Sequence, residues 1–262
     1  MVGMWKVNIV MAAAIGLAGV VATEAHAQAE TLNIAAAYSL KPAFNEIITM
    51  FEKEYGVPVH VMYGSSQALG RQIENGEPID LFFPASFEEV EKLYKKGLTL
   101  KRKPRIYAQT SLVLVMSAAS VASSISFHDV LPNRVRIALG DPKTSILGEI
   151  TARTLTKLNP AYKYASNLIY GQHSEDVMNL INTRKADVGI VFRSDAINSG
   201  QMRIIDETPA GKLTSVRLGE AMVWTCREAS LENAEEFLDY MMSPRIQKLL
   251  LKHGFDSASS KE

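Results

Sequence analysis

The sequence is short of the residues that crosslink a chain or give it a strong net charge. Only one cysteine, Cys226, occurs in 262 residues, so no internal disulfide can form and stability must come from a hydrophobic core. Cys226 lies in the apolar stretch AMVWTC, which favours a buried, small hydrophobic residue. The 28 basic and 28 acidic residues cancel, so no broad field attracts nucleic acid or an anionic membrane. A charged ligand must therefore be recognised locally.

Long apolar runs are confined to the start of the chain. Lys6 precedes the apolar residues 9–22, and Ala25-His26-Ala27 matches a small-residue cleavage site. The run is short for a membrane span. We predict a secretory signal that is cleaved after Ala27 and a mature protein in the periplasm.

Motifs for metal, nucleotide or nucleophilic chemistry are missing. The five histidines show no H-x-H or H-E-x-x-H spacing. The nucleotide-binding motifs G-x-x-x-x-G-K-[ST] and G-x-G-x-x-G are also missing. Residues 64–68, GSSQA, lack the second glycine of a G-x-S-x-G nucleophile elbow. We therefore expect no enzyme and no cofactor. A periplasmic hydrolase that uses Ser65 or Ser66 is the alternative from a different class.

Strand-like and helix-like segments alternate along the mature chain. Strands are predicted from apolar or alternating runs at 32–37, 57–63, 79–83, 111–116, 135–139 and 188–192. Helices are predicted from about Pro42 to Gly56, after Ser66, from a capping box at 86–89 to Gly97, and over 145–158, 174–183, 232–242 and 245–253. This rhythm predicts an α/β fold with mostly parallel sheets flanked by helices.

Two α/β units of similar size follow one another without a linker. We expect the chain to cross from one lobe to the other near 110–116 and to return near 212–221. Residues 28–110 and 220–262 would form the first lobe, and residues 111–219 the second. The cleft between two such lobes is the expected ligand site.

Hydroxyl side chains recur where a strand passes into a helix. Such a junction exposes unpaired N–H groups and the positive end of the helix dipole, so several of them facing one cleft would hold an anion with neutral donors. Each hydroxyl also has a simpler interpretation as a helix cap. The residues are Ser39, Ser65, Ser66, Thr144, Ser145 and Ser174.

Several of these junctions carry a family resemblance. AAAYSL at 35–40, YGSSQALGRQIENGEPIDLFFPAS at 63–86, GDP at 140–142, SEDVMNLI at 174–181 and VGIVFRSDAINS at 188–199 stand in an order that resembles the periplasmic molybdate-binding proteins of ABC uptake systems. The resemblance extends from about residue 32 to 255. It implies a type II periplasmic binding protein fold, with molybdate or tungstate bound in the cleft and delivered to a membrane permease, and we expect a monomer.

The resemblance also implies a ligand set. The oxyanion would be held through its oxygens by the hydroxyls of Ser39 and Ser66, with Ser65 beside them, and by the backbone N–H groups of Leu147 and Val177. Leu147 stands where the family commonly has alanine, and its amide survives that change.

Three further positions bear on which anion fits. The family commonly has a tyrosine hydroxyl at the position of Phe192, so one donor is missing here. Arg193 adds a cation next to it, and Tyr38 could supply another hydroxyl. These departures keep open a different anion, such as sulfate, phosphate, an organic carboxylate or a phosphonate.

Overall fold

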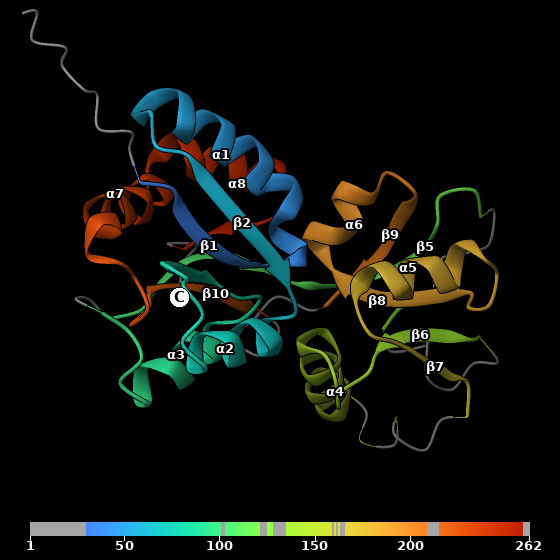
Figure 1. Cartoon of the computed structure of the whole chain (residues 1–262). Coiled ribbons are helices and arrows are strands. Elements are labelled where there is room, and N and C mark those ends of the chain that lie inside the picture. Colours follow the sequence, from blue (N-terminus) through green and yellow to red (C-terminus); the bar gives the residue numbers. More distant parts are fainter. Residues whose placement is uncertain are drawn as a thin grey trace, which may run out of the picture.

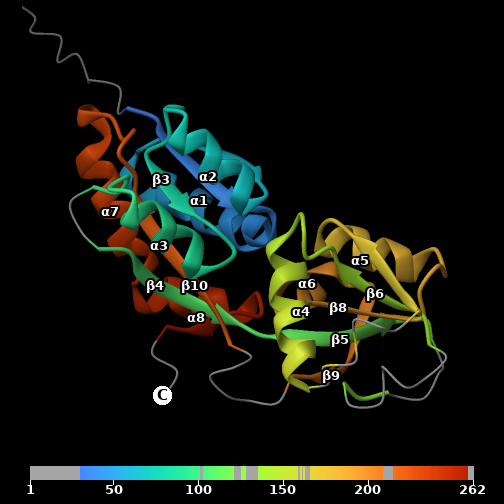
Figure 2. The same ribbon diagram turned by 90° about the horizontal axis from the view of Figure 1, so that it is seen from below.

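The computed structural model describes residues 30–100, 103–120, 125–127, 135–158, 160, 162, 166–208 and 215–258. The predicted signal segment lies outside these residues. Two separate β-sheets, each flanked by helices, form two lobes that lie side by side in Figures 1 and 2. The α/β class and the two-lobed architecture expected from the sequence are confirmed.

The first sheet has six strands in the order β11-β4-β10-β3-β1-β2. These strands are β1 (Leu32–Ala37), β2 (Val59–Gly64), β3 (Leu81–Phe83), β4 (Arg105–Thr110), β10 (Val216–Met222) and β11 (Asp256–Ser257). Strand β1 runs parallel to β2 and β3, whereas β10 is antiparallel to β3 and β4, and β11 is antiparallel to β4.

The second sheet has five strands in the order β7-β6-β8-β5-β9. These strands are β5 (Leu112–Ser117), β6 (Ile137–Gly140), β7 (Leu168–Gly171), β8 (Val188–Phe192) and β9 (Met202–Glu207). Strand β6 is parallel to β7 and β8, and β5 is antiparallel to β8 and β9.

Both sheets are therefore mixed, and the expectation of mostly parallel sheets is wrong. The antiparallel pairs arise where the chain leaves one sheet and returns: β4 and β10 carry the two crossings in the first sheet, and β5 and β9 carry them in the second. A strand that leaves and a neighbouring strand that returns must run in opposite directions. Residues 216–219, expected in the second lobe, lie in β10 of the first sheet.

The predicted helices occur close to their expected positions, and one was missed. The helices are α1 (Lys41–Tyr55), α2 (Ser66–Glu74), α3 (Phe87–Lys95), α4 (Ile146–Leu158), α5 (Ser174–Asn182), α6 (Arg193–Ser199), α7 (Leu231–Met241) and α8 (Pro244–Lys252), with short 3-10 turns η1 (Tyr38–Leu40) and η3 (Glu228–Ser230). Pro42 stands in the first turn of α1, and Gly56 ends it at φ 68°. Ser86 precedes α3, but its side chain makes no capping bond, so the expected capping box is absent.

Aromatic side chains from distant segments form the centre of the first lobe. Phe44 of α1 packs edge-on against Phe83 of β3, and Phe83 packs in the same way against Tyr107 of β4. Phe237 of α7 contacts both Phe51 and Phe83. All five rings are fully buried. The cluster joins the N-terminal and C-terminal parts of the chain into one lobe.

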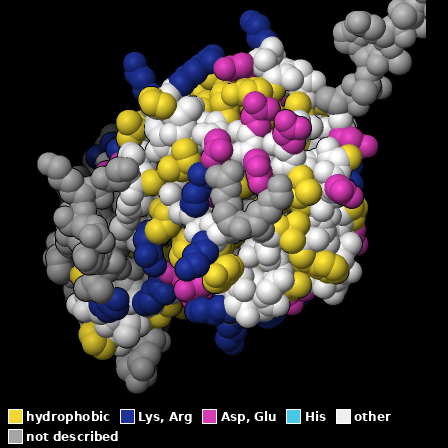
Figure 3. Space-filling view, turned by 90° about the vertical axis from the view of Figure 1, so that its left-hand side faces the viewer, with side chains coloured by type: hydrophobic (Ala, Val, Ile, Leu, Met, Phe, Trp, Pro, Cys, Tyr) yellow, Lys and Arg dark blue, Asp and Glu magenta, His cyan; other side chains and the backbone are white. Residues whose placement is uncertain are grey.

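Charged side chains of both signs occur on the outer face of the first lobe in Figure 3. This view agrees with the zero net charge of the whole sequence. Within the described residues, no helix is long and apolar enough to cross a membrane.

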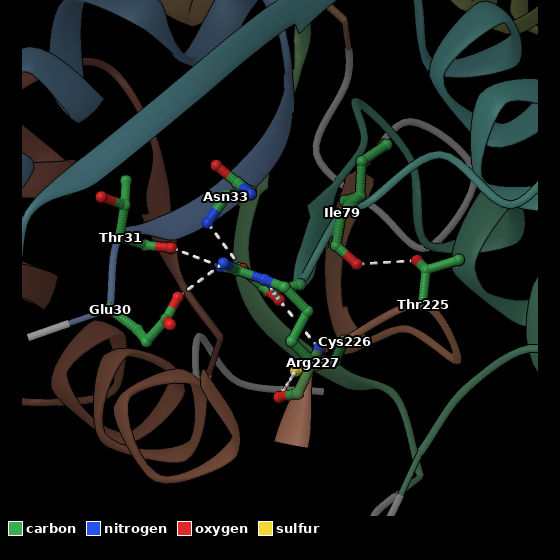
Figure 4. Close-up of polar contacts among 8 residues, drawn as sticks. Glu30, Thr31, Asn33, Ile79, Thr225, Cys226 and Arg227 are labelled. Atoms are coloured by element: carbon green, nitrogen blue, oxygen red, sulfur yellow. Dashed lines mark hydrogen bonds and ion pairs between the residues drawn. The ribbon is translucent and has the colours of Figure 1, made fainter. Parts of the chain in front are cut away.

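A buried ion pair fastens the first strand to the segment after β10. Asp80 is fully buried and accepts hydrogen bonds from the N–H of Asn33 at 2.7 Å, the N–H of Arg227 at 3.1 Å and Arg227 Nη2 at 2.8 Å. Arg227 also reaches Glu30 Oε2 and the Thr31 carbonyl (Figure 4). The hydrogen bond to Asp80 raises the pKa of Arg227. Neighbouring Cys226 is only half-buried, although it packs against the core.

Replacing Arg227 with methionine should destabilise the first lobe. The change leaves the Asp80 carboxylate buried without its cation, which costs about 3 kcal/mol or more. Arg245→Met is the matched control, because Arg245 pairs with Glu54 on the surface and such pairs are worth about 0–1 kcal/mol. Urea unfolding followed by tryptophan fluorescence measures both. Equal losses in the two variants would contradict the anchoring role.

Candidate functional site

A cavity of about 640 Å³ opens between the two lobes. Its first-lobe wall comes from the residues after β1 and β2, and its second-lobe wall from those after β6, β7 and β8. Figures 1 and 2 both place α4 and α6 at the side of the second lobe that faces the first. β1 is parallel to β2, and β6 is parallel to β7 and β8, so their carboxyl ends meet at the cavity, which is the usual ligand position in α/β sheets.

Three serine hydroxyls line the first-lobe wall. Ser65 caps α2, and its Oγ accepts the Ala68 N–H at 3.3 Å. Ser66 is 3% exposed, and its Oγ accepts the Ala85 N–H at 2.9 Å. Ser39 lines the same wall. A serine oxygen that accepts an N–H keeps its own hydrogen to donate, so Ser65 and Ser66 remain available as donors to a ligand.

Helix α4 presents backbone donors from the second lobe. Ser145 uses its side chain inside the turn: its hydroxyl donates to the Asp141 carbonyl at 3.2 Å, and its Oγ accepts the Gly148 N–H at 3.1 Å. Ile146 and Leu147 also line the cavity and stand in the first turn, where N–H groups lack helical partners. The Leu147 side chain is 3% exposed and belongs to the core, so its size does not block the cavity.

Two glycines allow this turn to pack tightly. A Cβ added to Gly148 would come within 2.3 Å of the Asp141 carbonyl carbon, and one added to Gly140 would come within 2.6 Å of the Gly148 nitrogen. Backbone atoms cannot move aside as the end of a flexible side chain can, so a Cβ at either position would distort the turn. The position of the Leu147 N–H therefore depends on Gly148.

Val177 does not reach the cavity. Its side chain is fully buried, and its N–H donates to the His173 carbonyl at 3.1 Å within the first turn of α5. Because α5 begins at Ser174, Val177 is already the fourth residue and its donor is satisfied. Ser174 and Glu175, earlier in the same turn, line the cavity instead.

Arg193 also lies away from the cavity. Its Nε is 3.5 Å from Glu207 Oε1, and its Nη1 is 3.7 Å from Asp256 Oδ1 and 3.4 Å from the Gly254 carbonyl. The expectation that Arg193 supplies a donor to the ligand is therefore not met. Phe192 does line the cavity, and its ring is 4% exposed and offers no donor.

Tyr38 faces the second lobe from the rim. Its side chain is 51% exposed, and its ring centroid lies 5.4 Å from that of His173, which precedes α5. The aromatic pair joins the two walls of the cavity. The sequence indicates Tyr38 as a possible hydroxyl donor but does not predict its contact with His173.

The structure places at the cavity a carboxylate that the sequence pattern does not predict there. Asp195 lies in the first turn of α6 and lines the cavity. Burial raises the pKa of Asp195 to about 6, and a hydrogen bond with Ser174 opposes part of that shift. The only sequence signal was its place three residues after a buried strand, and the helix that orients it was not predicted.

The charge of the cavity wall differs from that of most anion sites. Among the described residues that line it there is no lysine or arginine, while Asp195 and Glu175 carry carboxylates. In the same described part of the chain, no group of three or more His, Cys, Asp or Glu side chains could hold a metal ion. Recognition of an anion must rest on hydroxyl and backbone N–H groups and on the side chains of Gln67, Gln172, His173 and Asn198, which also line the wall.

Two lobes joined by paired crossings, with a ligand-sized cavity between them, define the class of two-lobed solute-binding proteins. The chain belongs to the bacterial extracellular solute-binding protein family, whose model matches residues 32–256. The chain is therefore a binding protein and not an enzyme.

Named relatives agree with this assignment. The chain is 30% identical over 226 residues to a putative ABC transporter substrate-binding lipoprotein of Bacillus subtilis, covering 86% of each chain. It is 29% identical to the molybdate-binding protein ModA of Escherichia coli, covering 95% of this chain and 96% of ModA. The substrate-binding domain of a putative molybdenum ABC transporter from Clostridium difficile superposes with a TM-score of 0.71 at 28% identity, covering 87% of this chain and 98% of that domain.

Gly148→Ala should damage both stability and ligand binding. The new Cβ meets the backbone of Asp141 and Pro142, and overpacking of this kind costs about 1–3 kcal/mol. Gly70→Ala is the control, because a Cβ there meets nothing within 4 Å and alanine in a helix gains about 0.5–1 kcal/mol. Thermal unfolding compares the two. A neutral Gly148→Ala would show that the turn is not tightly packed.

Proposed function

We propose that this protein captures a tetrahedral oxyanion outside the cytoplasm and delivers it to an ABC permease. Molybdate is the first candidate, and tungstate follows because it has the same charge and a similar shape. The observation that carries the proposal is the set of neutral donors around one cavity: the hydroxyls of Ser39, Ser65 and Ser66, and the first-turn N–H groups of α4 and α5.

Neutral donors suit a ligand that must be released. Each hydrogen bond to a charged oxygen contributes about 1.5–3 kcal/mol, so several together give tight binding without a buried counter-charge. Four oxygens of a tetrahedral anion can each meet donors from a different wall. The expected ligand set keeps Ser39, Ser66 and Leu147, and replaces Val177 with Ser174 or Glu175 as the backbone donor of α5.

The cavity is larger than one tetrahedral anion needs, so we expect the lobes to close around it. The relatives named as molybdate-binding or molybdenum-transport proteins support the choice of anion. The rings of Tyr38 and His173 are already in contact across the cleft at 5.4 Å, so closure would have to take place around this contact.

A different anion is the second candidate. Phe192 gives the cavity wall an apolar ring without a donor, which favours an anion with an organic part, such as a carboxylate or phosphonate, over a fully hydrated one. Sulfate and phosphate remain within this alternative. Arg193 no longer supports it, because its guanidinium is engaged with Glu207 and Asp256.

A serine hydrolase receives no support from the site. The Oγ atoms of Ser65 and Ser66 accept backbone N–H bonds, and within the described residues neither serine is hydrogen-bonded to a histidine. A nucleophilic serine needs an adjacent general base. We further propose a periplasmic location after cleavage behind Ala27, a monomeric state and no nucleic-acid partner, in line with the neutral net charge.

A thermal-shift screen tests the proposal. Molybdate or tungstate at about a hundred times its Kd should add about 2.7 kcal/mol of stability. Ser66→Ala should weaken that response, whereas Ser86→Ala, equally buried but away from the cavity, should keep it. Sulfate, phosphate and small organic anions form the comparison panel. No response to molybdate or tungstate at millimolar concentration would reject both ligands and leave the second candidate.

Phe192→Tyr separates the two candidates. If the site takes molybdate, a new hydroxyl on the cavity wall should strengthen binding by about tenfold or more, which corresponds to about 1.5 kcal/mol. If the ring serves an organic anion, the added hydroxyl should weaken binding of that anion. Isothermal titration measures both, and Phe127→Tyr, buried outside the cavity lining, controls for effects on folding alone.

A further inference from the structure

The wall of the proposed anion cavity contains an uncompensated acid. Asp195 lines the cavity, and no ion pair to it occurs among the described residues. Arg193, two residues before it, is held by Glu207 and Asp256 on another side. An ionised carboxylate next to a bound dianion is repelled strongly, because water is displaced from the closed site.

Ser174 ties this acid to the ligand position. It begins α5, lines the cavity, and its side chain is hydrogen-bonded to Asp195. The donors proposed for the anion and the carboxyl of Asp195 therefore share one neighbour. A carboxyl in its neutral form both removes the repulsion and adds a donor for an oxyanion.

We propose that Asp195 makes binding of the oxyanion proton-linked, so that one proton enters the site with each dianion. This inference rests on the proposed function, because it requires an oxyanion as ligand. The proton comes from the solvent and binds a carboxylate oxygen of Asp195; no other bond is made or broken. Asp195 thereby becomes a specificity-determining residue, because the site binds a dianion together with a proton that neutralises this carboxylate.

The direction in which pH changes the affinity follows from the protonation of Asp195 in the free and in the ligand-bound protein. Without ligand the pKa of Asp195 is about 6, and a bound dianion raises it further. Below about pH 6 the acid is already neutral, so affinity is highest. As the pH rises above about 6, affinity falls by up to tenfold per pH unit, because each binding event must take up one proton.

The other titratable groups around α6 either have partners of their own or can be tested by single substitutions. His173 and Glu175 face the cavity from the start of α5, and Asp176 there accepts the N–H groups of Gln172 and His173. Strands β5 and β8 carry no charged residue. Strand β9 carries Arg203, which contacts Met116, Asp206, which accepts the Phe127 N–H, and Glu207, which pairs with Arg193. The segment after α8 carries His253, which contacts Asn198 and Glu46, and Asp256, which pairs with Arg193.

Asp195→Asn is the decisive variant. It keeps the shape and an acceptor for Ser174 but cannot ionise. We expect its Kd for molybdate or tungstate to be independent of pH between about 6 and 8.5, and at least about tenfold lower than that of the wild type at the upper end. Titration calorimetry in Tris and in bis-Tris, which differ in ionisation enthalpy, should show uptake of about one proton by the wild type and none by the variant.

Two controls isolate the acid. His173→Gln removes the imidazole at the cavity, and Glu175→Gln removes the second carboxylate there. Whatever their affinities, both variants should keep the pH slope of the wild type. Loss of the slope in His173→Gln would assign it to the histidine and overturn the proposal.

The remaining outcomes are distinguishable. If the wild type binds an oxyanion with a constant Kd and no proton uptake, or if Asp195→Asn binds more weakly at every pH, Asp195 only positions Ser174 and the inference fails while the proposed function stands. If neither protein binds any oxyanion of the panel across this pH range, the proposed function itself fails.

Discussion

The arrangement of the two lobes depends on the two places where the chain crosses between them. A single residue, Ser111, separates β4 of the first sheet from β5 of the second, and the returning chain is fastened beside it. The N–H and the hydroxyl of Thr208 both donate to the Leu112 carbonyl, at 3.1 and 3.0 Å, and the Arg193 N–H donates to the Ser111 carbonyl at 2.9 Å. These bonds set how the two lobes face each other and therefore which residues share the cavity. Among the described residues, further contacts between the lobes join Arg193 to the Gly254 carbonyl and Asn198 to His253.

The position of Arg193 shows how this constraint controls the chemistry of the site. Its guanidinium spans from α6 of the second lobe to the Gly254 carbonyl and Asp256, which follow α8 of the first lobe. The cation thus supports the junction of the lobes and is withdrawn from the cavity. What remains on the described part of the wall is a set of hydroxyls, backbone N–H groups, side-chain amides and one imidazole, with the acids Asp195 and Glu175 among them. Such a wall binds an anion by hydrogen bonds, and it makes the protonation state of Asp195 matter.

Much of the fold could be predicted because strong local patterns determine it. The apolar runs of β1, β5 and β8 are buried on both faces, and α1 has both a proline in its first turn and a glycine at its end. Strands β4, β7, β9, β10 and β11 and helix α6 were missed. Strands β7 and β9 are half-exposed along most of their length, so no apolar run marks them. The mixed strand directions were also missed, since direction depends on where the chain crosses between sheets and not on the residues within a strand.

The residues of the candidate site also fall into two groups, those whose place could be predicted from sequence and those whose place only the structure revealed. The place of Ser39, Ser65 and Ser66 on the cavity wall could be predicted from sequence because each lies within two residues of a strand end, where the nearby residues determine the local geometry. Only the tertiary structure decided that Val177 is satisfied within its helix, that Arg193 faces the junction and that Asp195 faces the cavity. The reason is physical: the direction of a long or charged side chain is set by the partners it finds. For Arg193 those partners, Glu207 and Asp256, come from segments 14 and 63 residues further along the chain.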